Sequence, residues 1–325
     1  MTFSTEVLST IIQHHRPNLA EDVQFTPIKT GKFNTSYMVT AGEQRMVLRI
    51  APPRTATFVF YEREMMRQEP QLHSLLRAET DVPVARVFAF DDTRTLIDRD
   101  YILMERLPGR PLSDMGQTNY AHVLQQIGNY LSQVHALHAT QYGYLGAHKP
   151  MEPQRNWVDA FAIMWHKMID DIAGIGFYDE AESGSMRRLL DSYLHLFDRP
   201  VLACLLHMDV WHQNILIGWN NTVTGLIDWD RALWGDPEIE FAVLDYCGIS
   251  EPAFWEGYGV DRDTSPEAQV RQIFYLLYEL QKYIVIRYGR SHNPGAAQQY
   301  KHQVMQIINQ THLLSGTGFR ENNAT

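Results

Sequence analysis

The stretch His207-Met208-Asp209-Val210-Trp211-His212-Gln213-Asn214 decides how this chain is interpreted. It places His, Asp and Asn at relative positions 1, 3 and 8, and Asp228 follows Asn214 by fourteen residues. One carboxylate can receive a hydroxyl proton, while an amide and a second carboxylate can offer oxygen atoms to Mg²⁺. The spacing predicts an apparatus that moves a phosphoryl group from a nucleotide to an alcohol.

Each polar residue of this stretch has an expected role. Asp209 is predicted to orient the acceptor hydroxyl and to take its proton. Asn214 and Asp228 are the predicted Mg²⁺ ligands, because Mg²⁺ needs few protein oxygens when water and phosphate complete its octahedron. His207 is expected to brace the loop through hydrogen bonds.

The flanking residues predict three short strands. Apolar runs cover residues 201–206 and 215–217, and a third strand is expected over 223–227 after the turn at Asn220 and Asn221. A hairpin of the last two strands would bring Asn214 and Asp228 side by side at its open end. Chance spacing is the alternative, and a correctly placed Asp after a hairpin argues against it.

These residues resemble the catalytic loop and metal-binding segment of the aminoglycoside phosphotransferase family, near its hygromycin-type members. The family loop reads His-Gly-Asp-x-x-x-x-Asn, and here Met208 replaces the Gly. Family members also carry Gly-Asp-Pro after the metal-binding Asp, as in Gly235-Asp236-Pro237. Asp236 is expected to tie that helix start to the catalytic loop. The resemblance runs from about Phe25 to Tyr246, and only residues 207–242 are highly specific.

The resemblance implies a protein-kinase-like, two-lobed α+β fold. The small N-lobe would cover residues 1–104, with a nucleotide lid, a five-stranded antiparallel sheet and one helix. Residues 105–110 would form a hinge. Residues 111–325 would form a large, mainly helical C-lobe that carries the catalytic loop, the metal-binding segment and the acceptor pocket.

A nucleotide lid is predicted between two strand-like runs near the N-terminus. Its backbone N–H groups and hydroxyls can face phosphates, and the residues concerned are Gly31, Lys32, Asn34, Thr35 and Ser36. An ordinary hairpin turn is the alternative for this segment alone. Arg49 lies where the family has a phosphate-contacting Lys or Arg.

A helix is predicted from about Tyr61 to Arg77, and Glu69 is the best candidate in it to pair with Arg49. Pro70 follows Glu69 directly and should kink or restart the helix there, which leaves the pairing open. The hinge resembles the family's Met-Glu followed by a Pro-Gly turn. Backbone groups of Met104, Glu105, Arg106 and Leu107 would bind the edge of a purine.

Composition agrees with a two-lobed, intracellular protein. The 325 residues are 45% hydrophobic, and neither a signal-peptide pattern nor a long apolar span is present in the sequence. We expect a cytoplasmic monomer or weak dimer without a membrane partner. The net charge of −10 argues against nucleic acid as a partner.

Charge also suggests the acceptor. Eight acids and one base lie between Gly235 and Thr264, and an acidic rim would attract a cationic molecule. The alternative is a solvated surface that keeps the protein soluble. Four residues are candidates for the acceptor pocket, although Trp residues more often belong to a core: Trp157, Asp230, Glu238 and Trp255.

The sequence therefore predicts an O-phosphotransferase that uses ATP or GTP with Mg²⁺ and acts on a small hydroxylated molecule. An aminoglycoside-type antibiotic is the leading acceptor, which would connect the protein to antibiotic resistance. Choline, a sugar, an amino alcohol or a macrolide are alternatives on the same fold. A non-catalytic nucleotide-binding protein is disfavoured because Asp209, Asn214 and Asp228 are all present.

Overall fold

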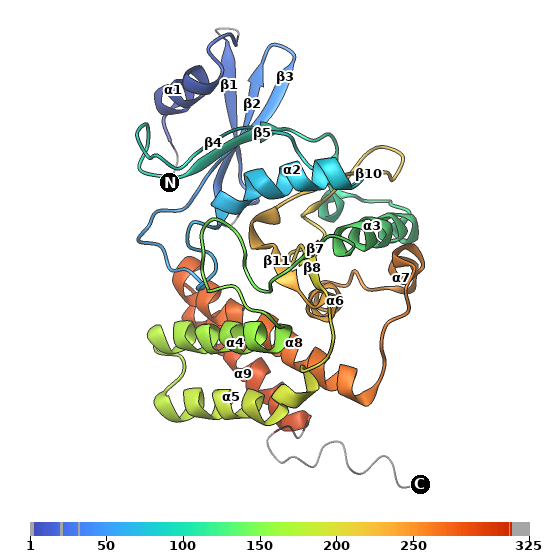
Figure 1. Ribbon diagram of the computed structural model, residues 1–325. Helices are drawn as coiled ribbons and strands as arrows, with labels where there is room; N and C mark the ends of the chain where they lie inside the picture. Colours follow the sequence, from blue (N-terminus) through green and yellow to red (C-terminus); the bar gives the residue numbers. More distant parts are fainter. Residues whose placement is uncertain (1–2, 20–21, 32, 312, 314–325) are drawn as a thin grey trace.

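An antiparallel sheet of five strands, in the order β1-β2-β3-β5-β4, builds the N-terminal part of the chain (Figure 1). The computed structural model describes residues 3–19, 22–31, 33–311 and 313. The elements of this part are α1 (Thr5–His15), β1 (Val23–Ile28), β2 (Thr35–Ala41), β3 (Gln44–Ile50), α2 (Glu69–Glu79), β4 (Val87–Asp91) and β5 (Tyr101–Glu105).

The N-terminal sheet is covered on one face by α1. Alternate residues of β2, namely Tyr37, Val39 and Ala41, are buried, as expected for a strand with one face against a core. Leu8, Ile11 and Ile12 of α1 are buried in one apolar cluster with Tyr37 and Val39. The helix is therefore held to the sheet by one apolar stripe.

The helix after β3 begins later than predicted. A short 3₁₀ turn covers Met65–Gln68, and α2 starts at Glu69. Pro70 lies in the first turn of α2, where a missing N–H breaks no helical hydrogen bond, so it starts the helix instead of kinking it. Residues 51–64 form turns instead, and the Phe60 N–H donates to Asp171 Oδ2 at 2.6 Å.

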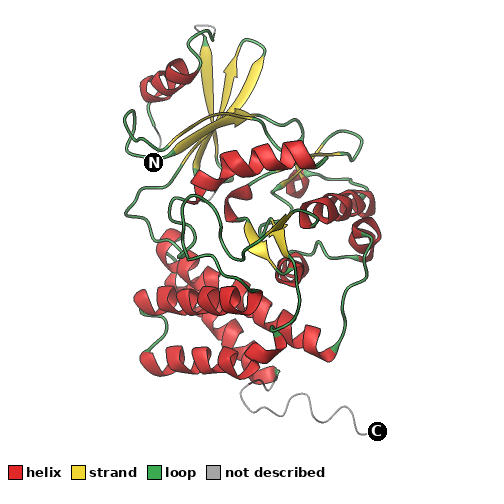
Figure 2. Ribbon diagram, viewed as in Figure 1, coloured by secondary structure: helices red, strands yellow, loops and turns green. Residues whose placement is uncertain are grey.

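The C-terminal part is mainly helical (Figure 2). Its helices are α3 (Tyr120–His135), α4 (Trp157–Gly174), α5 (Glu180–Tyr193), α6 (Pro237–Tyr246), α7 (Pro252–Tyr258), α8 (Pro266–Val285) and α9 (Pro294–Gln310). Its strands are β6 (Arg110–Pro111), β7 (His138–Ala139), β8 (Ala203–Leu206), β9 (Ile215–Ile217), β10 (Val223–Leu226) and β11 (Leu233–Gly235). This arrangement of a sheet-rich lobe and a helical lobe is the predicted fold class.

Two small sheets in the C-terminal part hold the predicted catalytic stretch. Strand β9 pairs with β10 in a hairpin, and Leu226 lies opposite Ile215. The Ile227 N–H donates to the Asn214 carbonyl at 3.0 Å, so the hairpin brings Asn214 and Asp228 to the same end.

Within the described residues, no helix has the length and apolarity that a bilayer span requires.

Candidate active site

The predicted catalytic loop, residues 207–214, connects β8 to β9 and is hydrogen-bonded to Glu240 of α6. The two carboxylate oxygens of Glu240 accept the His207 N–H at 3.0 Å and the Met208 N–H at 2.7 Å. His135 Nε2 lies 2.9 Å from the same carboxylate. Met208 has a left-handed φ of 66°, which costs a residue with a side chain about 1–2 kcal/mol. Burial of its side chain and the bond to Glu240 offset this strain.

His207 braces this loop from within. Its Nδ1 accepts the Asp209 N–H at 3.2 Å, so its Nε2 carries the proton and donates to the Ile227 carbonyl at 3.0 Å. Burial lowers the pKa of His207, which favours the neutral ring that this bonding pattern needs. His207 thus links the loop to the strand that leads into Asp228.

Asp209 and Asn214 lie next to each other in the loop, Asp209 half-buried and Asn214 buried. Asn214 Nδ2 donates to the Asp209 carbonyl and to Asp209 Oδ2, both at 2.9 Å. Its amide oxygen takes part in neither bond and can serve as a ligand. Burial opposes ionisation of Asp209, but the charges of Arg231 and Lys282 outweigh it and lower the pKa of Asp209. Asp209 is therefore an anion at neutral pH.

Arg49 of β3 forms ion pairs with three carboxylates. Its guanidinium lies 2.6 Å from Glu69, 2.5 Å from Asp228 and 3.0 Å from Asp230. The predicted pairing of Arg49 with Glu69 is thus present in the structure. Burial raises the pKa of Glu69 to about 7 against the opposing charge of Arg49. Burial and the negative charge of Asp228 raise the pKa of Asp230 well above its usual value. One cation thus faces more negative charge than it can neutralise.

The predicted lid lies over this charge cluster. Asn34 Nδ2 lies 3.4 Å from Asp230 Oδ2, and Asn34 Oδ1 is buried without a hydrogen-bond partner among the described residues. Thr35 and Ser36 begin β2, and Ser36 is opposite Arg49 in the sheet register. Gly31 precedes them in the same loop, while Lys32 is outside the described residues.

The predicted hinge leaves the sheet at Glu105. The Glu105 N–H donates to the Arg86 carbonyl at 2.8 Å, and the Arg106 N–H donates to the Arg45 carbonyl at 3.2 Å. These two amides are therefore already used by the sheet. Met104 and Leu107 contribute to an apolar cluster at this edge. Gly109 has a φ of 105°, and a Cβ there would lie 2.7 Å from the Ile217 carbonyl oxygen, so the turn requires glycine.

Sequence reasoning missed a buried charge chain behind Asp209. Arg231 Nη1 lies 2.6 Å from Asp209 Oδ1, and Arg231 Nη2 lies 3.3 Å from Glu279 Oε2. Lys282 forms an ion pair with Glu279 one turn further along α8. The available signal was a Glu and a Lys three residues apart in the mostly apolar run 273–285, because such residues are rarely buried without a partner.

Three of the four residues predicted for the acceptor pocket lie elsewhere in the fold. Trp157 is buried in the core of the helical part, where its indole N–H donates to Tyr275. Both carboxylate oxygens of Glu238 bind Arg271. Trp255 packs among aromatic residues of α6 and α7. In each case packing or ion pairing within the chain occupies the side chain, and none of these contacts supports a role in binding the acceptor.

Asp230 and Asp236 also differ from their predicted contacts. Asp230 binds Arg49 and Asn34 at the junction with the sheet instead of lining an acceptor pocket. Asp236 caps α6 by accepting the Glu238 N–H at 3.1 Å, but its other partners are Arg199 and Tyr275. The contact from α6 to the catalytic loop is made by Glu240, because one helical turn carries that side chain beneath the loop.

Replacing Glu240 by alanine is expected to lower the free energy of unfolding by about 3–5 kcal/mol, because two loop amides and His135 lose a buried partner. Urea denaturation measures the change. Glu251→Ala is the matched control, since Glu251 is exposed and its side chain does not cap α7. A loss below about 1 kcal/mol, the usual worth of one hydrogen bond, would contradict this role of Glu240.

Comparison with known proteins places this site in a family. A sequence profile of the phosphotransferase enzyme family (APH) matches residues 24–268. A probable ketoamine kinase from Vibrio parahaemolyticus is 26% identical over 264 residues, covering 77% of this chain and 82% of the relative. Hygromycin-B 4-O-kinase from Escherichia coli is 29% identical over 149 residues, covering 44% and 42%.

Solved structures share the fold. A thermostable mutant of aminoglycoside phosphotransferase APH(4)-Ia, in complex with AMP-PNP and hygromycin B, superposes with a TM-score of 0.67 at 18% identity. The match covers 94% of this chain and 98% of that structure. Because the family profile spans well over half of its length, the chain belongs to the phosphotransferase enzyme family.

Proposed function

We propose that this phosphotransferase moves the γ-phosphoryl group of a nucleoside triphosphate to a hydroxyl of a small sugar-derived molecule. The observation that carries the proposal is the ionised Asp209, fixed by Asn214 and lying next to the hairpin that ends at Asp228. A carboxylate held in this way can orient a hydroxyl and receive its proton.

Mg²⁺ is the proposed metal cofactor. The residues fit it, because the one guanidinium of Arg49 pairs with three carboxylates, Glu69, Asp228 and Asp230, and this excess of acidic groups favours a divalent cation. Asn214 and Asp228 would hold the ion through oxygen atoms, which Mg²⁺ prefers. When bound, Mg²⁺ would neutralise charge on the transferring phosphate oxygens.

The nucleotide would bind between the sheet and the catalytic loop. We propose that Gly31, Asn34, Thr35 and Ser36 cover its phosphates and that Arg49 contacts them. Residues 105–110 would be the hinge between the parts 1–104 and 111–325. Since the Glu105 and Arg106 amides already pair with the sheet, the Glu105 carbonyl and the Leu107 N–H are the proposed contacts of the base.

The chain's own residues can perform the proton transfer. Asp209 would accept a hydrogen bond from the acceptor hydroxyl through the carboxylate, and the proton would pass to it as the oxygen attacks phosphorus. Asn214 and Arg231 hold this carboxylate from two sides and fix its orientation. The positive charge of Arg231 keeps Asp209 ionised until the hydroxyl is in line.

Internal ion pairs weaken the case for a polycationic acceptor. Five of the eight acids between Gly235 and Thr264 already have a basic side chain as a partner within the chain, and in four cases that partner is an arginine. Asp236 and Glu238 bind Arg199, Glu240 binds His135, Asp245 binds Arg262, and Asp263 binds Arg271. Behind Asp209, Arg231 and Lys282 balance the charge of Asp209 and Glu279. A polycation would therefore find few unpaired anions here.

A ketoamine, a sugar carried on an amine, is our leading acceptor. It presents sugar hydroxyls with a single basic amine, whereas an aminoglycoside carries several, and this lower positive charge suits the balanced charges around Asp209. The relative named ketoamine kinase supports this choice along 82% of its length. An aminoglycoside is the second candidate, supported by the shorter match to hygromycin-B 4-O-kinase.

A coupled assay of ADP or GDP release tests the acceptor. The panel contains a glycated amine, hygromycin B, other aminoglycosides, free sugars, choline, an amino alcohol and a macrolide. We expect the glycated amine to give a kcat/KM at least about tenfold above that of every aminoglycoside, or about 1.4 kcal/mol of discrimination. If an aminoglycoside is turned over with the highest kcat/KM, the proposal of a ketoamine acceptor is wrong. If choline is the best acceptor, the proposal that the phosphoryl group goes to a sugar hydroxyl is wrong.

A further inference from the structure

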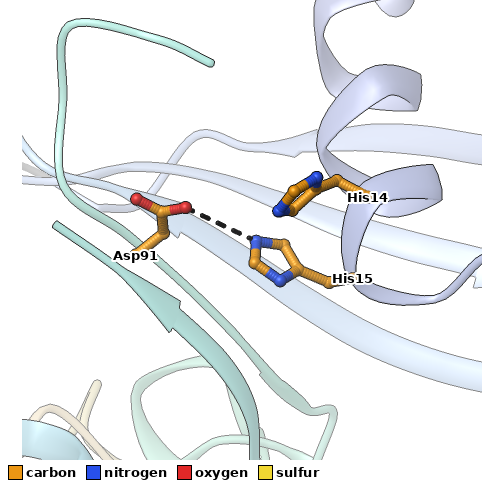
Figure 3. A group of neighbouring side chains, drawn as sticks. All are labelled: His14, His15 and Asp91. Carbon is orange, nitrogen blue, oxygen red and sulfur yellow. Dashed lines mark ion pairs between the residues drawn. The ribbon is translucent and has the colours of Figure 1, made fainter. Parts of the chain in front are cut away.

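Two histidines and an aspartate meet at the end of α1 on the N-terminal sheet (Figure 3). They are His14, His15 and Asp91, and one ligand atom from each lies within 4.8 Å of the others. The catalytic loop contributes nothing to this group, which joins the last turn of α1 to the end of β4. Its chemistry is therefore separate from the proposed phosphoryl transfer.

The fold fixes the positions of these three residues. Leu8, Ile11 and Ile12 attach α1 to the sheet, so the end of the helix is held over β4 and β5. The rings of His14 and His15 are 4.7 Å apart and almost perpendicular. His15 Nε2 lies 3.9 Å from Asp91 Oδ2. A tetrahedral ion with ligands at about 2.0–2.2 Å needs ligand atoms roughly 3.3–3.6 Å apart, so small side-chain rotations would bring these atoms into range.

Outer contacts orient the carboxylate as they do in metal sites. Asp91 Oδ1 accepts the backbone N–H and the hydroxyl of Thr93, at 2.8 Å and 2.7 Å. Asp91 Oδ2 accepts the Tyr101 hydroxyl at 3.1 Å and faces His15. Because that hydroxyl proton is used by Asp91, His15 Nε2 donates to the Tyr101 oxygen at 2.9 Å.

The donor atoms also suit a transition metal ion. Imidazole nitrogens with one carboxylate are a donor set for a divalent transition metal ion, whereas Mg²⁺ prefers oxygen ligands throughout.

We propose that His14, His15 and Asp91 bind one divalent transition metal ion of the Zn²⁺ class, with water completing the coordination. The proton on His15 Nε2 would move to Nδ1, which frees Nε2 as a ligand while Tyr101 keeps its bond to Asp91. The ion would tie the end of α1 to β4 and stabilise the N-terminal part.

Calorimetric titration of the full chain, prepared without a histidine tag, tests this site with Zn²⁺. We expect one equivalent to bind in buffer that contains excess Mg²⁺. Titration with Co²⁺ should give visible absorption bands from a site that includes imidazole nitrogen. His14→Gln, His15→Gln and Asp91→Asn are each expected to weaken Zn²⁺ binding by at least about tenfold.

His14→Gln is the decisive variant, because His14 is exposed and its loss should leave folding intact. His122→Gln is the matched control, since His122 is likewise an exposed histidine on a helix. Binding that is equally strong in His14→Gln and in the wild-type chain would overturn the site. So would the absence of binding by the wild-type chain, or a matching loss of affinity in His122→Gln.

Discussion

Replacing Asp209 by asparagine is expected to lower kcat by about 10²- to 10⁴-fold, the usual contribution of a positioned general base. Asparagine keeps the shape of the side chain, but it cannot accept the hydroxyl proton at neutral pH. The nucleotide affinity should change little, because the residues proposed to bind phosphate lie on the sheet around Arg49. Steady-state kinetics with the best acceptor and a nucleotide titration measure the two quantities separately.

Asp170→Asn is the control for this experiment. Asp170 also pairs with an arginine, Arg187, at 2.6 Å, but the pair is on the helical surface. Its loss should leave kcat unchanged, since exposed ion pairs contribute little. An Asp209→Asn variant that keeps wild-type kcat would remove Asp209 as the base. A parallel loss of nucleotide affinity would show that the substitution disturbs the whole site.

The catalytic loop could be predicted from sequence because its geometry is local. His207, Asp209 and Asn214 lie in one loop, and a single short hairpin carries the chain from Asn214 to Asp228. Strand patterns of a few residues were enough to place both ends of that hairpin. The pairing of Arg49 with Glu69 could be proposed for a similar reason, since one strand and the helix that follows it supply both residues.

Long-range ion pairs could not be predicted in the same way. Arg231 meets Glu279 across 48 residues, and Glu240 meets His135 across 105 residues. A single sequence does not indicate which acidic residue will form an ion pair with a buried arginine. The same limit applies to the predicted acceptor-pocket residues. A count of charges in the sequence cannot distinguish an acid that is paired within the fold, such as Glu238, from one that faces a ligand.

Replacing Asp228 by asparagine should abolish most of the Mg²⁺ dependence of nucleotide binding. The loss of one anionic ligand is expected to cost about 3–4 kcal/mol of transition-state stabilisation, which corresponds to about 10²- to 10³-fold in kcat. Arg49 would keep its contacts to Glu69 and Asp230. Because the charge of Asp228 adds to burial in raising the pKa of Asp230, its removal should lower that pKa and favour the ionised form of Asp230.

Nucleotide titrations with and without Mg²⁺ separate this effect from general damage. Affinity measured without Mg²⁺ should be similar in Asp228→Asn and in the wild-type chain, whereas the gain on adding Mg²⁺ should be lost. Asp98→Asn is the control, because Asp98 is an exposed acid whose partner is its neighbour Arg99. If the Mg²⁺ titration of Asp228→Asn is the same as that of the wild-type chain, Asp228 is not a Mg²⁺ ligand and only forms the ion pair with Arg49. The grouping of three carboxylates around Arg49 would then need another explanation.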